Sequence, residues 1–364
     1  METKPFIALQ LLGSPTSKFW YDLSMLYGRE VLCPQGFRLR YVVAHPDGHW
    51  HVTDDIGELG MALSRKQMIQ KVAGADLAVP HMFCHEGLTT IRTLFEDELG
   101  IPLVGSSGAV AARSQDKVET KRLAAAAGVC VAAGFVLDKQ GIQELIHDLD
   151  AVHANADGTS VSIALKDKSR TQPLPCIVKP NYSDNSDGVS LVRTVDAFVP
   201  ALKNAMEYND HVIIEEYIDG RELRTALIEL DGKFVMLPAI EYGVNANNPI
   251  RQATDKLKFD DEGNLLAQSD KKHVPATCPA SIDTQLRAEL KQMMVATHKA
   301  LGCRDFSMMD FRVSAQTGKP HLLETGLFWS FSEKSMISSM LTATDHDLME
   351  ITRAIWLAAM KRST

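Results

Sequence analysis

The sequence predicts an α/β protein that is divided into several domains. Strand-like and helix-like segments alternate from the first residues to the last, a pattern typical of layered α/β folds. The length of 364 residues suggests two or three domains. With 45% hydrophobic and 23% charged residues, the chain has the composition of a folded protein rather than a disordered one.

The composition argues against several classes of partner. The 38 Lys and Arg residues are outnumbered by 46 Asp and Glu residues, and the formal net charge is −8. This balance disfavours a general nucleic-acid binder, although a local basic cleft stays open. No apolar run reaches the roughly 18 residues of a membrane span, and residues 1–15 carry no clear signal-peptide cleavage pattern. The six cysteines show no CxxC and no zinc spacing. We therefore expect a cytoplasmic chain with reduced thiols and no nucleic-acid or membrane partner.

The first 115 residues predict a parallel series of βα units. Short apolar runs predict strands at 6–13, 39–43, 75–79 and 101–105, and a helix is expected over 88–99 with Gly100 as its C-terminal cap. Polar side chains follow the third run, where an α/β sheet places its ligands. They are His81, His85 and Glu86. Substrate contact and ordinary structural hydrogen bonds are equal alternatives for them.

The middle of the chain predicts a capped helix and two further strands. Asp116, followed three residues later by Glu119, resembles a capping box and predicts a helix over 117–127. Residues 151–175 are the least regular segment, and we expect a connection or an insertion on a domain surface there. Strands are expected over 176–179 and 211–218, and the second leads into Asp219-Gly220, a pair typical of a tight hairpin turn.

Two lysines and a group of acids in this region are candidate ligand contacts. Lys179 ends a strand just before the polar loop 181–190, so its ammonium could reach a phosphate, and Lys117 begins a helix. There is no Walker A motif, and each lysine alone is more simply a solvated side chain. Residues 215–222 could present backbone groups to a purine and Glu222 to ribose hydroxyls. The alternative there is a charged edge strand.

The last third predicts a hairpin between two helices. The helices are expected over 283–301, capped by Gly302, and over 345–361. Residues 307–326 predict a hairpin symmetric about Thr317, which places Asp310 opposite Glu324. Opposed side chains lie about 5 Å apart at Cβ, and two like charges there need compensation. Mg²⁺ supplies it and favours carboxylates together with substrate phosphates. The alternative is a solvated face with the register one residue off.

In their order, these segments resemble the ATP-grasp ligases, most of all the D-alanine:D-alanine ligase family. The resemblance covers nearly the whole chain and rests on Asp116-Lys117, the segments 177–190 and 215–222, Asp310 with 322–324, and 99–106. It implies an α/β protein of the ATP-grasp fold with three domains. An N-terminal parallel α/β domain is expected over 1–115, and central and C-terminal α+β domains over 116–219 and 220–364 are expected to clamp ATP.

The resemblance also implies a role for each matching position. The phosphates of ATP would lie on Lys117 and Lys179, under a loop that contains Asn185 and Ser186. Adenine would lie against Glu215, Glu216 and Ile218, ribose against Glu222, and Mg²⁺ on Asp310 and Glu324.

Two positions differ from the family pattern. Met308 stands where the D-alanine ligases carry Arg, and Gly326 stands where they carry an Asn ligand of the second Mg²⁺. Arg312, expected on the same face as Asp310, is then the candidate replacement for the arginine. Lys117, Lys179 and Arg312 form the predicted catalytic set. These differences favour a substrate other than D-alanine.

A narrower resemblance concerns the segments 11–29, 79–90 and 324–340, which look like the ATP-grasp ligases that make mycosporine-like amino acids. It implies an ADP-forming C–N ligase that joins Ser, Thr or a similar amino acid to mycosporine-glycine through a phosphorylated intermediate. The run 328–332 favours a ring-bearing substrate through stacking and hydroxyl contacts, or else it is core packing with Ser332 as a helix cap. The predicted substrate residues are His81, His85, Glu86, Glu241, Phe328, Trp329, Ser330 and Ser335.

Two other functions stay open. One is a dipeptide ligase that acts on ordinary amino acids through an acyl phosphate, and the other is an ATP-binding relative without catalysis. ATP-grasp relatives are often dimers, so the resemblance makes a homodimer an expected assembly, without an identified interface.

Overall fold

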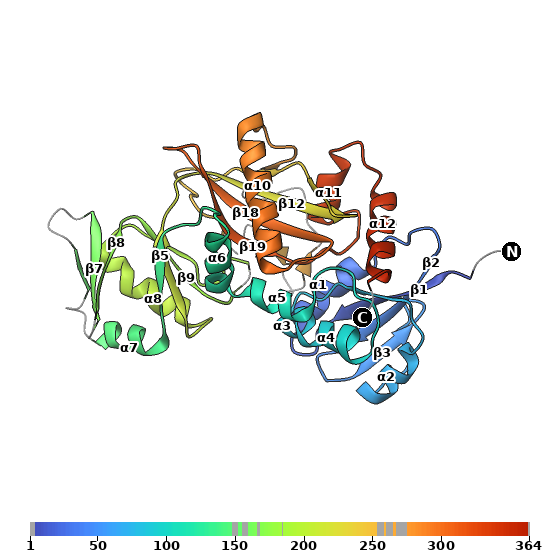
Figure 1. Cartoon of the computed structure of the whole chain (residues 1–364). Helices are drawn as coiled ribbons and strands as arrows, with labels where there is room; N and C mark the ends of the chain where they lie inside the picture. The colour runs from blue at the N-terminus through green and yellow to red at the C-terminus, as the bar shows by residue number, and fades with distance from the viewer. Residues whose placement is uncertain are drawn as a thin grey trace.

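The computed structural model describes residues 4–147, 152–154, 159–165, 168–183, 185–252, 258–259, 265–266 and 275–362. Three sheets of four to six strands follow one another along these ranges. The first and second lie at opposite ends of the molecule, and the third lies between them, beside helices α5 (Gly108–Gln115) and α6 (Lys117–Ala126) (Figure 1). No helix in the described ranges is long and apolar enough to cross a membrane. All six cysteines are free.

The first sheet confirms the predicted parallel arrangement for three of its four strands, whereas β3 pairs antiparallel with β2. Its order is β3-β2-β1-β4, and β1 runs parallel to both β2 and β4. The strands are β1 (Phe6–Gly13), β2 (Phe37–Ala44), β3 (Trp50–Thr53) and β4 (Leu77–Pro80). Helices α1 (Lys18–Gly28) and α2 (Arg65–Val72) connect them. The run at 101–105 forms only a bridge, through Leu103 to Ala78.

The prediction of one continuous helix over 88–99 is wrong. The segment forms α3 (His85–Leu88), α4 (Thr90–Thr93) and a π-helical turn, η1 (Leu94–Glu98). The break lies at Thr89, whose φ and ψ are −116° and −86° and whose hydroxyl donates to the carbonyl of His85 at 2.7 Å. A Thr hydroxyl that donates to the carbonyl four residues earlier often weakens or bends a helix. Gly100 has a positive φ of 63°, as expected of a helix-ending glycine.

The second sheet, of order β10-β9-β11-β5, is antiparallel along its length. Its strands are β5 (Gly134–Leu137), β9 (Cys176–Pro180), β10 (Ser190–Val192) and β11 (Val212–Glu216), and helices α7 (Lys139–His147) and α8 (Phe198–Met206) pack with it. Residues 151–175 are more regular than expected, and their small separate sheet agrees better with an insertion than with a simple connection. The described part of this segment forms a small sheet of β6 (Val152–Ala154), β7 (Ser160–Leu165) and β8 (Lys168–Pro173), and Val161 lies buried in the core.

The third sheet carries the predicted hairpin. Its order is β17-β14-β12-β18-β19, with β13 paired to β12. The strands are β12 (Gly220–Leu230), β13 (Lys233–Met236), β14 (Ile240–Tyr242), β17 (Ala276–Thr277), β18 (Phe306–Ser314) and β19 (Pro320–Gly326). The associated helices are α10 (Thr284–Leu301), α11 (Met336–Thr342) and α12 (Leu348–Met360). Gly302 ends α10 in the left-handed conformation, as predicted. Strands β15 (Lys258–Phe259) and β16 (Leu265–Leu266) pair separately, and most of the charged stretch 251–273 lies outside the described residues.

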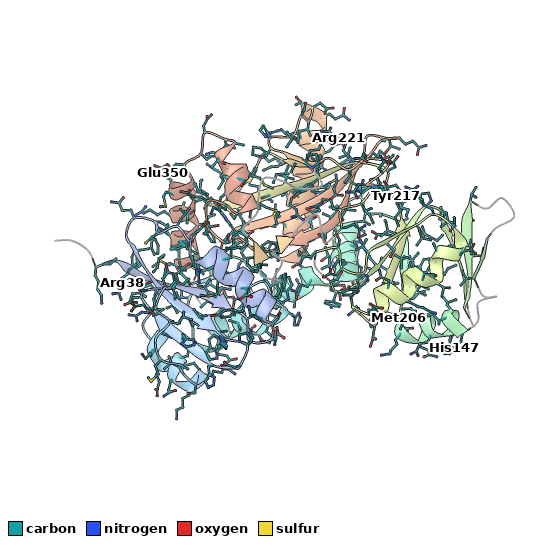
Figure 2. All side chains as sticks on the ribbon, turned by 180° about the vertical axis from the view of Figure 1, so that it is seen from behind. Arg38, His147, Met206, Tyr217, Arg221 and Glu350 are labelled. Carbon is teal, nitrogen blue, oxygen red and sulfur yellow. The ribbon has the colours of Figure 1, made fainter. Side chains whose placement is uncertain are left out.

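The hairpin predicted at Asp219-Gly220 is wrong, because β11 and β12 belong to different sheets. Residues 217–219 connect the two, and Tyr217 lies at this junction (Figure 2). Gly220 begins β12 with a φ of 139°, and a Cβ built on it would lie 2.0 Å from the carbonyl oxygen of Val313 on β18. The Asp-Gly pair therefore serves a close approach of two backbones rather than a turn.

This close approach predicts a large cost for Gly220→Ala. The added methyl would overlap a backbone oxygen that cannot move away, and we expect a loss of about 3 kcal/mol in the free energy of unfolding. Gly232→Ala is the matched control, since Gly232 also has a positive φ, of 71°, but open space around its Cβ position. Urea unfolding of both variants measures the difference, and equal losses would show that backbone conformation alone is responsible.

An aromatic cluster joins the first and third sheets. Trp329 stacks on Phe331 with ring centroids 4.2 Å apart, and Phe331 contacts Trp356 of α12, which in turn meets Phe37 of β2 edge-on. Phe306 of β18 packs against both Trp329 and Phe331. All five side chains are buried, so the segment that follows β19 is held in place by close packing against this cluster.

Candidate active site

Two adjoining cavities lie beside β18 and β19. The large cavity has a volume of about 410 Å³ and the small cavity about 110 Å³. Both are lined by Lys117, Ser183, Arg251, Asp310 and Glu324. The two carboxylates predicted to hold a metal ion therefore lie at the boundary between the cavities.

Aromatic side chains from three parts of the chain line the large cavity. They are Trp20, Tyr27, Phe83, Tyr182, Tyr242, Phe328 and Trp329. Phe83 meets Tyr27 and Phe328 with ring centroids 5.6 and 5.5 Å apart. Segments adjoining the first sheet and the third sheet thus both contribute to the aromatic wall of this cavity.

A buried cluster of two lysines and one glutamate lies beside the small cavity. Glu215 of β11 accepts hydrogen bonds from Lys179 of β9, at 2.6 Å, and from Lys121 of α6. Burial alone would raise the pKa of Glu215, but the charges of Lys121 and Lys179 and their hydrogen bonds lower it to about 2. Burial lowers the pKa of Lys121 to about 8, against the opposing effect of Glu215. Glu215 therefore fixes the ammonium of Lys179 at the cavity wall.

Lys117, in the first turn of α6, lines both cavities. The side chain of Asp116 accepts from the N–H of Glu119, which confirms the predicted helix start. The Lys117 ammonium donates to the carbonyl of Ser183 at 2.6 Å, on the loop that follows β9. In that loop Asn185 and Ser186 have positive φ values of 56° and 69°; Asn185 lines the large cavity and Ser186 the small one. Asp184 lies outside the described residues.

The predicted pairing of Asp310 with Glu324 is confirmed. The two residues are direct partners in the β18–β19 ladder, and Met308 pairs with Gly326 in the same register. A bulge follows Asp310, so that Phe311 pairs with Leu322 rather than with Leu323 as the symmetric hairpin predicts. Asp310 is buried, whereas the Glu324 side chain is 40% exposed.

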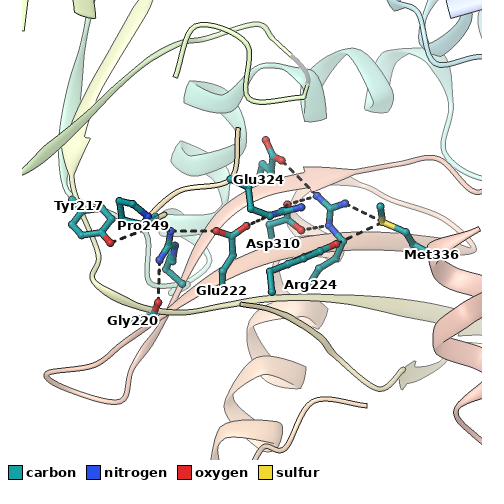
Figure 3. Close-up of polar contacts among 11 residues, drawn as sticks. Tyr217, Gly220, Glu222, Arg224, Pro249, Asp310, Glu324 and Met336 are labelled. Carbon is teal, nitrogen blue, oxygen red and sulfur yellow. Dashed lines mark hydrogen bonds and ion pairs between the residues drawn. The ribbon is translucent and has the colours of Figure 1, made fainter. Parts of the chain in front are cut away.

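Three arginines and three carboxylates form a continuous chain of ion pairs across this boundary (Figure 3). Arg312 lies 3.2 Å from Glu222, which also pairs with Arg251; Arg251 in turn lies 3.6 Å from Asp310. Both oxygens of Asp310 accept from Arg224. Nη2 of Arg224, which is one of the two donors to Asp310, also lies 4.0 Å from Glu324. Burial by itself would lower the pKa of Arg224, but Asp310 holds that pKa well above its usual range.

The donor set fits Mg²⁺ in chemistry. No group of three His, Cys, Asp or Glu side chains suited to a metal ion occurs among the described residues, so the protein offers a pair of carboxylates. Mg²⁺ is often bound by one or two carboxylates and completed by substrate phosphates and water. Arg224 occupies both oxygens of Asp310, so metal binding there requires the guanidinium to give up part of this contact.

The structure brings most of the predicted nucleotide-site residues together. Lys179, Ser186, Glu215, Glu216, Ile218, Glu222 and Arg312 line the small cavity together with the shared residues. Glu216 also accepts from the backbone N–H of Ala133 at 2.9 Å. Arg312 donates to the carbonyls of Gly220, at 3.0 Å, and of Pro249. It lines the small cavity but not the large one, so it lies on the side of the predicted nucleotide.

The predicted substrate residues divide into two groups. Five line the large cavity: His85, Phe328, Trp329, Ser330 and Ser335. Three line neither cavity, namely His81, Glu86 and Glu241. His81 is buried with Nε2 2.7 Å from Gln10, and burial lowers its pKa to about 3. Glu86 accepts from Thr16, and Glu241 is held in two hydrogen bonds of 2.7 Å by Arg221.

The run 328–332 both lines the large cavity and packs into the core. Trp329 lines the large cavity, yet it is also buried, and its indole N–H donates to Ser338 at 3.1 Å. The proposed cap at Ser332 is wrong, because Ser335 caps α11 and accepts from the N–H of Ser338. Ser332 is fully buried and pairs with Ser330 at 3.1 Å.

Sequence reasoning missed Lys121, Arg224 and Arg251. Lys121 lies four residues after Lys117 and therefore one helical turn further along α6, which was a readable signal. Arg224 follows Glu222 by two residues on one strand, so the two share a face. Arg251 carries no such signal, because it lies in an irregular segment.

The sheets, the paired carboxylates and the lysines beside them define a protein of the ATP-grasp fold. The chain matches the family model described as D-ala D-ala ligase C-terminus over residues 151–355, and it belongs to the D-alanine–D-alanine ligase family. Relatives include the D-alanine–D-alanine ligase of Pelodictyon phaeoclathratiforme, 26% identical over 73% of this chain and 66% of that protein. Another is the D-alanine–D-alanine ligase of Chlorobium limicola, 27% identical over 68% of this chain and 60% of that protein. The chain thus spans less than two thirds of the length of these curated relatives.

Solved structures share the fold over the whole chain. The D-Ala:D-Ser ligase VanG from Enterococcus faecalis has a TM-score of 0.72 at 17% identity and covers 98% of this chain and 99% of its own. A D-alanine–D-alanine ligase from Bacillus anthracis, complexed with ATP, has a TM-score of 0.68 at 19% identity, with 99% and 98% covered.

Proposed function

We propose that the chain is an ADP-forming C–N ligase that joins the amine of an amino acid to a phosphorylated small-molecule acceptor. The observation that carries this proposal is the boundary between the two cavities. Lys117, Asp310 and Glu324 line both of them. A nucleotide in the small cavity and an acceptor in the large cavity would therefore meet at these residues.

In this proposal the small cavity holds ATP. Adenine lies along 216–218, ribose near Glu222, and the phosphates on Lys117 and Lys179. Mg²⁺ on Asp310 and Glu324 would neutralise charge on the transferring phosphoryl group. The acceptor oxygen attacks the γ-phosphorus and ADP leaves; the amine then attacks the activated carbon, phosphate leaves, and the amine loses a proton. The aromatic wall would keep water away from the phosphorylated intermediate.

Two acceptors are candidates for the large cavity. The family and the names of the relatives favour a second amino acid, activated as an acyl phosphate. The cavity itself favours a ring compound such as mycosporine-glycine, because its volume of about 410 Å³ and its seven aromatic side chains exceed what a methyl side chain requires. Neither relative reported above is named for mycosporine-glycine.

The test is a substrate matrix with ADP formation and product mass as readouts. Pairs of D- and L-amino acids form one set, and mycosporine-glycine with serine, threonine or glycine forms the other. We expect at least one pair to raise ADP formation roughly tenfold above ATP alone, because phosphoryl transfer awaits a correctly placed acceptor.

The pattern of stimulation decides among the alternatives. Stimulation by two amino acids alone identifies a dipeptide ligase, whereas a requirement for the ring compound, with an ultraviolet shift of the product, identifies the second acceptor. ATP binding without stimulation by any pair contradicts the ligase proposal and favours the non-catalytic relative.

A further inference from the structure

Arg224 lies at the centre of the cavity boundary, where an acceptor would have to react. It comes from the middle of β12, directly opposite Asp310 of β18 in the antiparallel ladder. Its side chain is 11% exposed, and it lines the large cavity but not the small one. Of the three linked arginines, it is therefore the one that faces only the acceptor side.

The two edges of the Arg224 guanidinium differ in the strength of their partners. Nε and Nη2 donate to the two oxygens of Asp310 (Figure 3). On the other edge, Nη1 donates to the sulfur of Met336 at 3.0 Å, and Nη2 lies 4.0 Å from Glu324. A thioether sulfur is a weak acceptor, so a buried guanidinium gains when a carboxylate replaces it.

The charges around the large cavity favour an anion at this edge. Three cationic side chains line the cavity, Lys117, Arg224 and Arg251, against two carboxylates, Asp310 and Glu324. Arg251 is stacked over Tyr242 with its guanidinium carbon 3.6 Å from the ring centroid, which holds it in place. A divalent cation on the two carboxylates would increase this positive excess.

The surroundings restrict the shape of the anion. Met336 and Phe328 both line the large cavity with Arg224, and Phe328 meets Phe83, which in turn meets Tyr27 of α1. A ligand that contacts the Nη1–Nη2 edge of Arg224 therefore shares the cavity with these aromatic rings, which favours a flat apolar group for the rest of the ligand.

We propose that Arg224 is the anion-binding residue of the large cavity, and that its Nη1–Nη2 edge receives a carboxylate of a ring-bearing acceptor in place of the contact with Met336. The identification of this ligand as the acceptor rests on the proposed function. The binding site itself depends only on the cavity, the arginine edge and the aromatic wall.

The experiment measures equilibrium binding by calorimetry in the absence of nucleotide. The probes are N-benzoylglycine, which carries a ring and a carboxylate, and its neutral amide. We expect the wild-type chain to bind the acid roughly tenfold more tightly than the amide, since a charge-assisted pair replaces a contact with sulfur. Arg224→Gln should bind both probes equally.

Arg221→Gln is the matched control, because Arg221 lies on the same strand but pairs with Glu241 outside both cavities. It should keep the preference of the wild type. Since Arg224→Gln leaves Asp310 buried without its partner, the double variant Arg224→Gln/Asp310→Asn removes both charges and keeps the test valid if the single variant unfolds. The double variant should also lack the preference.

Three results would overturn the inference: no binding of the acid, equal binding of both probes by the wild type, or a preference that survives in the Arg224 variants. Because nucleotide is absent, the outcome is separate from the ligase assay. A chain that forms no ADP can still show the charge preference, and an active ligase can lack it.

Discussion

The Asp310→Asn variant is expected to form ADP about 10²–10³-fold more slowly than the wild-type chain at saturating ATP and Mg²⁺. The amide removes one of the two carboxylates proposed to hold Mg²⁺ at the boundary between the cavities. The amide is nearly the same size as the carboxylate, so the cavity keeps its shape. Coupled-enzyme detection of ADP with the substrate pair identified above measures the rate.

The control for this variant concerns stability. Asp310→Asn leaves the buried charge of Arg224 without a full partner, and loss of one member of a buried pair costs about 3 kcal/mol or more. The double variant with Arg224→Gln should recover part of that stability without recovering activity. A single variant that is folded and retains more than about a tenth of the wild-type rate would contradict the metal role of Asp310.

The Glu215→Gln variant is expected to lose about 3–5 kcal/mol of unfolding free energy at pH 7, because two buried ammonium groups lose their shared carboxylate. Its apparent affinity for ATP should also fall, since Lys179 is no longer held at the wall of the small cavity. Glu216→Gln is the matched control. The amide oxygen can still accept from Ala133, so a cost below about 1 kcal/mol is expected.

The pH dependence gives an independent check on Glu215. Its pKa is about 2 in the folded chain against an ordinary value of 4.5, so the unfolded chain binds the proton first as the pH falls. The stabilisation is complete above pH 4.5 and is lost between pH 4.5 and 2, by about 3 kcal/mol in all. Urea unfolding across this window should show a smaller loss in Glu215→Gln than in the wild type; parallel curves would contradict the assignment.

The carboxylate pair could be predicted because a hairpin is local. Its register follows from the position of one turn, and side chains alternate with a period of two, so Asp310 and Glu324 were placed opposite each other without tertiary information. The bulge after Asp310 escaped prediction, since it shifts only the pairing beyond that point.

The rest of the site could not be predicted from the sequence because it depends on contacts between residues far apart in the chain. Arg224 and Asp310 are 86 residues apart, and their meeting depends on β12 pairing with β18 rather than with β11. The Asp219-Gly220 pair suggested instead a hairpin between β11 and β12. In the sequence, a glycine required by a close approach of two backbones cannot be distinguished from a glycine required by a turn.

Arg92 links the amino-terminal sheet to the wall of the large cavity. This fully buried guanidinium donates to the carbonyl of Ser106 at 2.8 Å and to that of Leu327 at 2.9 Å, one residue before Phe328. Chimeras that exchange the first hundred residues between homologues would thus also exchange Arg92, which holds the backbone at the wall of the large cavity. Variants designed to change substrate selectivity should therefore exchange Arg92 together with residues 327–331.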